Sequence, residues 1–137
     1  MIVCPVMADV PVIPTCKAFP FGYGLDYLDV SYTNCSVTVA STTATIPITV
    51  HVELQNGPKS QTAAGGSKVV QIYFTPPVSP SRLTRYRHML GGFAKVRIGA
   101  AGATAAVDVP IPATNLAHWV PRRNGHVVDS GEYRLRL

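Results

Sequence analysis

The sequence predicts an all-β fold, a two-sheet sandwich of about six or seven short strands. Segments in which apolar residues occupy every second position recur at intervals of about ten residues, as expected for strands with one buried face. The 137-residue chain contains 11 glycines and 12 prolines, which interrupt the windows that could form helices. A chain of this length buries enough surface for one core, and its stability therefore requires neither a metal nor a cofactor.

Six segments are expected to form strands. The clearest is residues 45–54, where Ile, Val and Leu alternate with other residues and share one face. Residues 68–75 are rich in β-branched and aromatic residues and end at two prolines, a pattern typical of a buried strand. A turn is expected near Asn34 in the first segment, and a helical bend around Trp119 before the last. The six segments are residues 29–39, 45–54, 68–75, 90–98, 103–111 and 132–137.

Residues 1–18 are predicted to form an extended arm or linker, and residues 19–137 a single domain. Repeated prolines in the arm fix backbone torsions and remove hydrogen-bond donors. The arm is apolar, but it lacks a basic leading segment and contains Asp9, and we therefore do not interpret it as an export signal. The sequence leaves the cellular compartment open.

The chain has a formal net charge of +5, although only 14% of its residues are charged. A basic surface can attract nucleic acid, anionic glycans or membranes, and net charge does not select among them. No apolar stretch approaches the roughly 20 residues of a membrane-spanning helix, and the chain is expected to be soluble. The three cysteines, Cys4, Cys16 and Cys35, are odd in number and lack metal-binding spacing, which indicates neither a disulfide framework nor a zinc site.

The acids, histidines and single Trp give no catalytic motif. Asp26 and Asp29 are close in sequence, but they precede a strand, where Asp commonly supplies turn and cap hydrogen bonds. None of the four histidines lies in a nucleophile motif, and His51 is expected on a strand surface. Trp119 could be a platform for a sugar ring, but the expectation is a core residue. No catalytic, cofactor or metal site is predicted.

Aromatic residues and two basic clusters are the remaining candidates for binding. Phe19, Phe21 and Tyr23 alternate with Pro and Gly, and their rings either pack on their own sandwich or anchor it on another domain. The loops at residues 76–88 and 122–126 carry the basic clusters, expected as solvated charges at one end of the sandwich, with anion binding as the alternative. The clusters are Arg82, Arg85, Arg87 and His88, and Arg122, Arg123 and His126.

Several sequence motifs occur here in the order and spacing of one protein family. They are FPFGYGL at residues 19–25 followed by Asp26 and Tyr27, VVQIYF at 69–74, LGGF at 90–93, Leu116 with Trp119, and GEY at 131–133. In these motifs the chain resembles the C-terminal fibronectin type III-like domain of family 3 glycoside hydrolases, the β-glucosidase and β-xylosidase family. The resemblance spans residues 19–137.

The resemblance implies an immunoglobulin-like sandwich that serves as a non-catalytic accessory domain, with the catalytic acids in other domains of a parent enzyme. It implies docking on those domains, or on another protein chain, through Phe19, Phe21, Tyr23 and Tyr27. The loop of residues 76–88, with Arg82, Arg85, Arg87 and His88, is expected at the rim of a substrate cleft or in contact with an anion. Members of this family are often secreted or lysosomal. The alternatives are a standalone interaction protein and a glycan- or polyanion-binding module, while nucleic acid is disfavoured because no motif for it is present.

The sequence departs from the family pattern in three places. Val120 stands where an Asp usually follows the aromatic residue, and residues 128–131 differ from the usual acidic Pro-Gly turn. The sequence ends at Leu137, before the closing strand of the family. An unpaired sheet edge invites pairing with another segment, and we expect the apolar arm at residues 2–13 or a partner chain to cover it.

Overall fold

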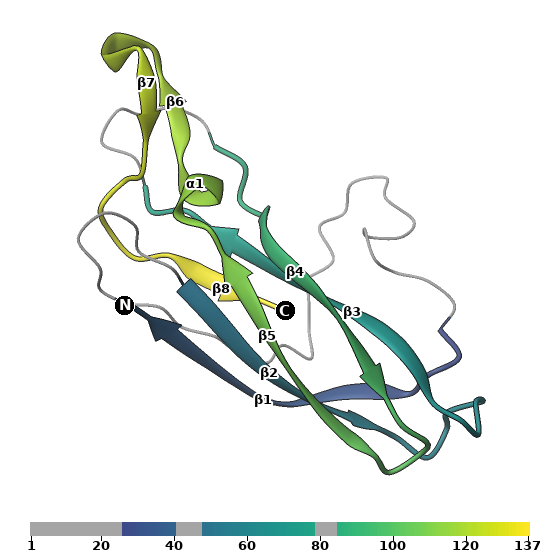
Figure 1. Cartoon of the computed structure of the whole chain (residues 1–137). Helices are drawn as coiled ribbons and strands as arrows, with labels where there is room; N and C mark the ends of the chain where they lie inside the picture. Colours follow the sequence, from purple (N-terminus) through teal and green to yellow (C-terminus); the bar gives the residue numbers. More distant parts are fainter. Residues whose placement is uncertain (1–25, 41–47, 79–84) are drawn as a thin grey trace.

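The computed structural model of the chain describes residues 26–40, 48–78 and 85–137. Their strands form two antiparallel sheets of three strands each and a two-stranded hairpin (Figure 1). The first sheet has the order β1-β2-β5, and the second has the order β4-β3-β8. The predicted all-β sandwich is confirmed. The strand bounds are Val30–Val39 (β1), Ile48–Asn56 (β2), Gly66–Thr75 (β3), Met89–Ile98 (β4), Thr104–Ile111 (β5) and Arg134–Arg136 (β8).

The core lies between the two sheets and is formed by alternate residues of the strands. On β2, Val50, Val52 and Leu54 are completely buried, as the alternation in the sequence predicts. Ile46, which belongs to the same pattern, lies outside the described residues. Removing each such aliphatic side chain from water contributes about 1.5–3 kcal/mol. The completely buried residues of β3, which face this row, are Val70, Ile72 and Phe74.

Strand β1 is continuous, and the turn expected near Asn34 is wrong. The register against β2 shifts between Tyr32 and Asn34, which is a β-bulge rather than a reversal of the chain. The side-chain oxygen of Asn34 accepts a hydrogen bond from the backbone N–H of Cys35 at 2.9 Å. The extra residue changes the phase of the apolar alternation, and in the sequence that change is indistinguishable from a turn.

Cys35 is disulfide-bonded, and this finding corrects the expectation that the cysteines form no disulfide. An odd count leaves one thiol over but does not prevent a pair from forming. The other two cysteines, Cys4 and Cys16, lie outside the described residues. Within the described ranges, three or more His, Cys, Asp or Glu side chains nowhere gather closely enough to hold a metal ion. No described helix has the length and apolar character needed to cross a membrane.

The two sheets approach each other most closely where β4 passes β5. A Cβ atom on Gly92 would overlap the carbonyl oxygen of Pro110, and a Cβ on Gly91 would lie 3.3 Å from the ring of Phe74. Only glycine therefore allows the two backbones to pass at this distance. Among the described strands, β8 pairs with β3 and forms the other edge of the second sheet. The covering of that edge by residues 2–13 concerns residues that are not described, and it stays a prediction.

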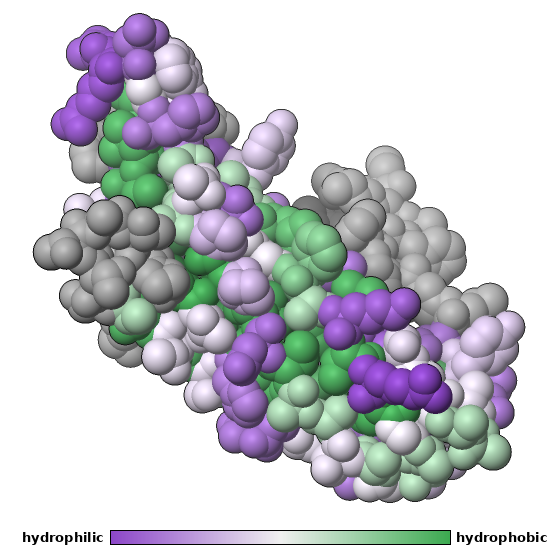
Figure 2. Space-filling view, in the orientation of Figure 1, coloured by the Kyte–Doolittle hydropathy of each residue, from purple (hydrophilic) through white to green (hydrophobic). Residues whose placement is uncertain are grey.

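A short hairpin follows the sandwich and projects beyond it in Figure 1, where it is yellow-green. The expected bend around Trp119 is wrong, because the helical turn comes earlier and Trp119 lies in a strand. Asn124, with φ of 46°, adopts the left-handed conformation and ends the helical turn at the tip of the hairpin. Hydrophilic side chains gather at this tip (Figure 2). The segments are α1 (Ala113–Leu116), β6 (His118–Val120), a 3-10 turn (Pro121–Arg123) and β7 (Gly125–Val127).

Candidate functional site

Tyr27 is the one described member of the predicted aromatic docking segment, and it is on the surface. Phe19, Phe21 and Tyr23 lie outside the described residues. The side chain of Tyr27 is 70% exposed, while its carbonyl oxygen accepts hydrogen bonds from the N–H of Gln61 at 2.8 Å and the hydroxyl of Ser60 at 3.4 Å. The backbone at Tyr27 is thus held in place, and its ring is free to contact a partner.

Asp26 and Asp29 organise the start of β1, in line with the structural role predicted for them. One carboxylate oxygen of Asp26 accepts the N–H of Leu28 at 3.0 Å, and the other pairs with Lys68. Burial alone would raise the pKa of Asp26, but the hydrogen bonds from Lys68 and Leu28 outweigh it and lower that pKa. Asp29 accepts the N–H of Lys59 at 3.2 Å. These contacts are turn and cap chemistry.

The first predicted basic cluster is divided by the fold. Arg82 lies outside the described residues. Arg85 is not a solvated charge, as its side chain is 9% exposed and donates to Asp129 at 2.8 Å and to the carbonyl oxygen of Leu116 at 3.3 Å. Arg87 and His88 are exposed. Partial burial lowers the pKa of His88, and the positive charges of Arg136 and Arg87 lower it further.

A buried polar cluster at the base of the hairpin was not foreseen from the sequence. It contains Arg85, Asp129 and His118, whose ring nitrogen lies 3.7 Å from the Asp129 carboxylate. The hydroxyl of Tyr133 donates to the carbonyl oxygen of Asp129 at 2.9 Å, and burial, together with the negative charge of Asp129, raises the pKa of Tyr133. Because 44 residues separate Arg85 from Asp129, no local sequence pattern could connect them.

Trp119 is 48% exposed, and the expectation that it belongs to the core is wrong. It packs edge-on against His126, with ring centres 5.4 Å apart. In the part of the chain that the structure describes, the hairpin has two strands, and no second layer covers one face of this ribbon. Arg122 and Arg123 are exposed in the turn next to it, as predicted. The hairpin thus exposes an indole ring on one strand and two arginine side chains in its turn.

His51 lies on the outer surface of β2, as predicted. Its Nδ1 atom is 2.7 Å from Asp108, its Nε2 atom is 3.8 Å from Glu53, and its side chain is 41% exposed. Strand pairing places His51 directly opposite Asp108 on β5. Exposed pairs of this kind contribute little to stability.

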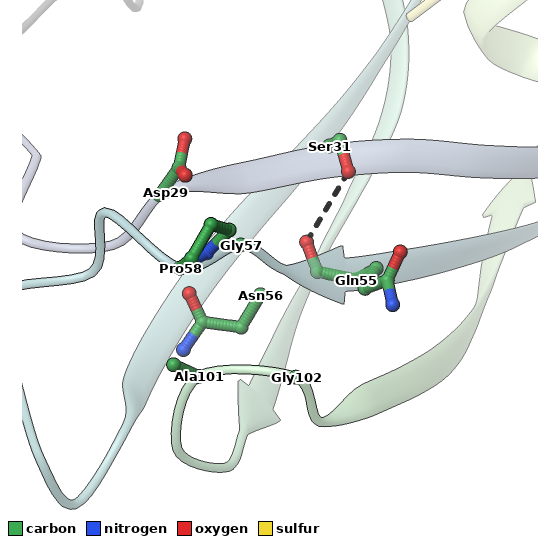
Figure 3. A pocket seen from close by; sticks show the side chains of 8 residues that line it. All are labelled: Asp29, Ser31, Gln55, Asn56, Gly57, Pro58, Ala101 and Gly102. Carbon is green, nitrogen blue, oxygen red and sulfur yellow. Dashed lines mark hydrogen bonds between the residues drawn. The ribbon is translucent and has the colours of Figure 1, made fainter.

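A hollow of about 520 Å³ lies where β1 begins and β2 ends (Figure 3). Asn56 is completely buried beside it, and its side-chain amide donates to the carbonyl oxygen of Gly99 at 2.9 Å. The hydroxyl of Ser31 reaches the carbonyl oxygen of Gln55 at 3.5 Å. Among the described residues that line it, Asp29 alone carries a carboxylate, whereas retaining glycoside hydrolysis requires two. The lining residues are Asp29, Ser31, Gln55, Asn56, Gly57, Pro58, Ala101 and Gly102.

The chain is similar to a known type of domain and to part of a larger enzyme. A family model described as a fibronectin type III-like domain matches residues 68–137. A probable β-glucosidase K from Emericella nidulans is 28% identical over 119 residues, which are 87% of this chain and 13% of that protein. The chain therefore spans about one eighth of the length of that relative.

Solved structures of β-glucosidases contain the same fold. DesR from Streptomyces venezuelae, solved in complex with D-glucose, has a TM-score of 0.67 and 27% identity over 85% of this chain and 14% of its own. β-Glucosidase 3B from Thermotoga neapolitana, solved in complex with glucose, has a TM-score of 0.66 and 29% identity over 86% of this chain and 15% of its own. The region of similarity is the small, non-catalytic C-terminal domain of these family 3 enzymes.

Proposed function

Because the chain belongs to the fibronectin type III-like domain family, we propose that it is the accessory domain of a family 3 glycoside hydrolase, and that it docks on the catalytic domains and stabilises them. The observation that carries this proposal is the coverage: 87% of the chain aligns with 13% of a β-glucosidase. A segment with this alignment accompanies a much larger polypeptide in its relatives. The parent enzyme acts on a glycoside, and its sugar specificity depends on its other domains.

The chemistry of the described residues supports an accessory role. The hollow beside Asn56 contains one carboxylate, and Asp26 and Asp29 are both occupied with backbone groups. The large apolar core between β2 and β3 suits a domain that supports others. In this proposal the domain contributes surface and stability, while the two acids of the reaction belong to the catalytic domains.

We propose that the aromatic segment of Phe19, Phe21, Tyr23 and Tyr27 forms part of the docking surface. The 70% exposed ring of Tyr27, on a backbone fixed by two hydrogen bonds, supports this role. Aromatic side chains dominate the energetics of buried interfaces, and Phe21→Ala should destabilise the parent enzyme by more than about 1 kcal/mol. An unchanged thermal midpoint of the full-length variant would refute the role of this segment.

The test of the accessory function uses the complete polypeptide that contains this sequence. Its thermal midpoint and its hydrolysis of an aryl β-glucoside are measured with and without residues 19–137. We expect deletion to lower the midpoint, and we expect the isolated chain to show no hydrolysis. A complete polypeptide without a glycoside hydrolase domain, or a midpoint unaffected by the deletion, would overturn the proposal.

A glycan-binding module is the second candidate, and the exposure of Trp119 favours it. Indole faces stack on the apolar faces of sugars, and Arg122 and Arg123 in the turn of the same hairpin would add affinity for an anionic glycan. Calorimetric titration with neutral and anionic oligosaccharides at low and high salt tests this function. Binding that Trp119→Ala abolishes would support it, and no binding at millimolar concentrations would exclude it.

A further inference from the structure

The outer face of the second sheet exposes a row of large apolar side chains. Pairing between β3 and β4 places Phe93 opposite Gln71, Val69 opposite Lys95, and Leu90 opposite Tyr73. Residues that are directly opposite in an antiparallel pair share one face of the sheet. The exposed fractions are 65% for Phe93, 44% for Leu90 and 42% for Val69.

All charged residues that this pairing places on the same face are basic. Lys95 and Arg97 lie on β4, and Arg134 and Arg136 lie on β8, opposite Thr75 and Tyr73. Arg134 is paired with Glu132 at 3.2 Å. In Figure 2, strongly hydrophilic side chains stand beside hydrophobic surface over β4. We call this outer surface of the β4-β3-β8 sheet the basic face.

The outer face of the other sheet has the opposite character. Its central row is Ser36, His51 and Asp108, and Glu53 lies opposite Asn34 in the next row. The acids are Glu53 and Asp108, and no residue on this face belongs to the large apolar side chains that are exposed in the described ranges. A sandwich that was solvated on both sides would have two similar polar faces. The difference indicates that the basic face is covered in the native protein.

We propose that the basic face docks on a carboxylate-bearing protein surface of the catalytic domains of the parent enzyme, an inference that rests on the proposed function. An apolar centre, with Phe93 as its largest side chain, and a rim of Lys and Arg correspond to the anatomy of a protein interface. The excess of positive charge favours a partner surface that carries acidic groups. Since the chain aligns with only 13% of its β-glucosidase relative, the remainder of such a polypeptide provides the partner surface.

Side-chain footprinting of the complete parent polypeptide and of the isolated chain tests this proposal. Hydroxyl-radical oxidation of Phe93 should be slower in the parent by about fivefold or more, as for a residue that enters an interface core. Oxidation of His51, on the opposite face, should be equally fast in both samples. Equal oxidation of Phe93 in both samples overturns the proposal.

Two variants and one matched control identify what holds the face in place. Phe93→Ser and Lys95→Glu should return the oxidation of Leu90 in the parent to its rate in the isolated chain. The control Lys59→Glu makes the same charge change in an exposed turn, and it should leave Leu90 protected. Unfolding of each isolated variant by urea verifies that the sandwich itself is intact. Protection of Leu90 that survives both variants overturns the proposal.

The outcomes separate this inference from the proposed function. If deleting the domain destabilises the parent but Phe93 stays reactive, the accessory function stands and the basic face is not its docking surface. If the isolated chain self-associates in sedimentation experiments and Phe93→Ser prevents it, the occupant of the basic face is a second copy of the chain. That result would also overturn the proposal.

Discussion

In the sandwich, the space between β2 and β3 is filled by apolar side chains such as Leu54 and Phe74, whereas the base of the β6–β7 hairpin is built around charge. There, Arg85 and Asp129 form an ion pair with side chains only 9% and 12% exposed, next to His118. Apolar contacts are non-directional and tolerate small shifts, while a buried ion pair depends on its geometry and on both partners. The two regions should therefore respond differently to substitution.

The largest effect is expected in the interior of the sandwich. Phe74→Ala removes a completely buried ring and leaves a cavity, which should lower the free energy of unfolding by about 3–5 kcal/mol. Urea denaturation measures this loss. The matched control is Phe93→Ala on the neighbouring strand, where the ring is 65% exposed and the cost should stay below about 1 kcal/mol. Equal losses would contradict the assignment of inner and outer faces.

The charged base of the hairpin should give the next effect. Asp129→Asn keeps the shape of the side chain but leaves the Arg85 guanidinium buried without an opposite charge, at a cost of about 2–3 kcal/mol. Hydrogen exchange should accelerate first at the amides of β6 and β7. Asp108→Asn is the control, because its partner His51 is exposed and such pairs contribute less than about 1 kcal/mol. Uniform acceleration across all strands would contradict a local role.

Substitutions at two glycines test how tightly the backbone is packed in the sandwich and in the hairpin. Gly92→Ala places a methyl group onto the carbonyl oxygen of Pro110 and should destabilise the protein by about 1–3 kcal/mol, since the sheets must separate. Gly125→Ala in the hairpin meets its nearest atom at 3.6 Å and should change stability by less than about 1 kcal/mol. Thermal unfolding of both variants provides the comparison. Similar thermal midpoints for the two variants would show that the space between β4 and β5 can accommodate an additional methyl group.

The smallest effect concerns pH and the ion pair between Asp26 and Lys68. Folding lowers the pKa of Asp26, which means that the unfolded chain binds more protons as the solution becomes acidic. The ionised Asp26 carboxylate therefore stabilises the folded state at pH values above its ordinary pKa of about 3.9, and this stabilisation is lost as the pH falls below that value. Urea midpoints measured from pH 6 to pH 3 should fall less steeply for Asp26→Asn. Because the pair is partly exposed, the difference should be small, and a steeper fall would contradict the assignment.

The sandwich could be predicted from the sequence and the hairpin could not, for a physical reason. Residues 45–54 and 68–75 are long enough for the alternation of a half-buried strand to show, and the structure has strands at both. Strands β6 and β7 have three residues each, which is too short for any period to be visible. The exposed position of Trp119 and the burial of Arg85 both follow from the hairpin, and both were predicted wrongly.

Functional features that depend on local sequence could be predicted, whereas features that depend on strand order could not. The turn chemistry of Asp26 and the surface position of His51 follow from local sequence, because each depends on neighbours within a strand or its preceding turn. The basic face depends on which strands are adjacent, since Arg136 of β8 reaches Tyr73 only through sheet order. No pattern within β3 or β8 alone contains that information.

Asn56 has a consequence for how the chain selects its strand alignment during folding. A slip of β2 by one residue would carry His51 and Glu53 into the interior, and the cost of burying them excludes it. A slip by two residues keeps apolar side chains inward and would otherwise be tolerated. Such a slip would, however, separate the Asn56 amide from the carbonyl oxygen of Gly99 and leave the amide buried without this hydrogen bond. The buried amide of Asn56 thus disfavours the two-residue slip of β2 that hydrophobic burial alone would tolerate.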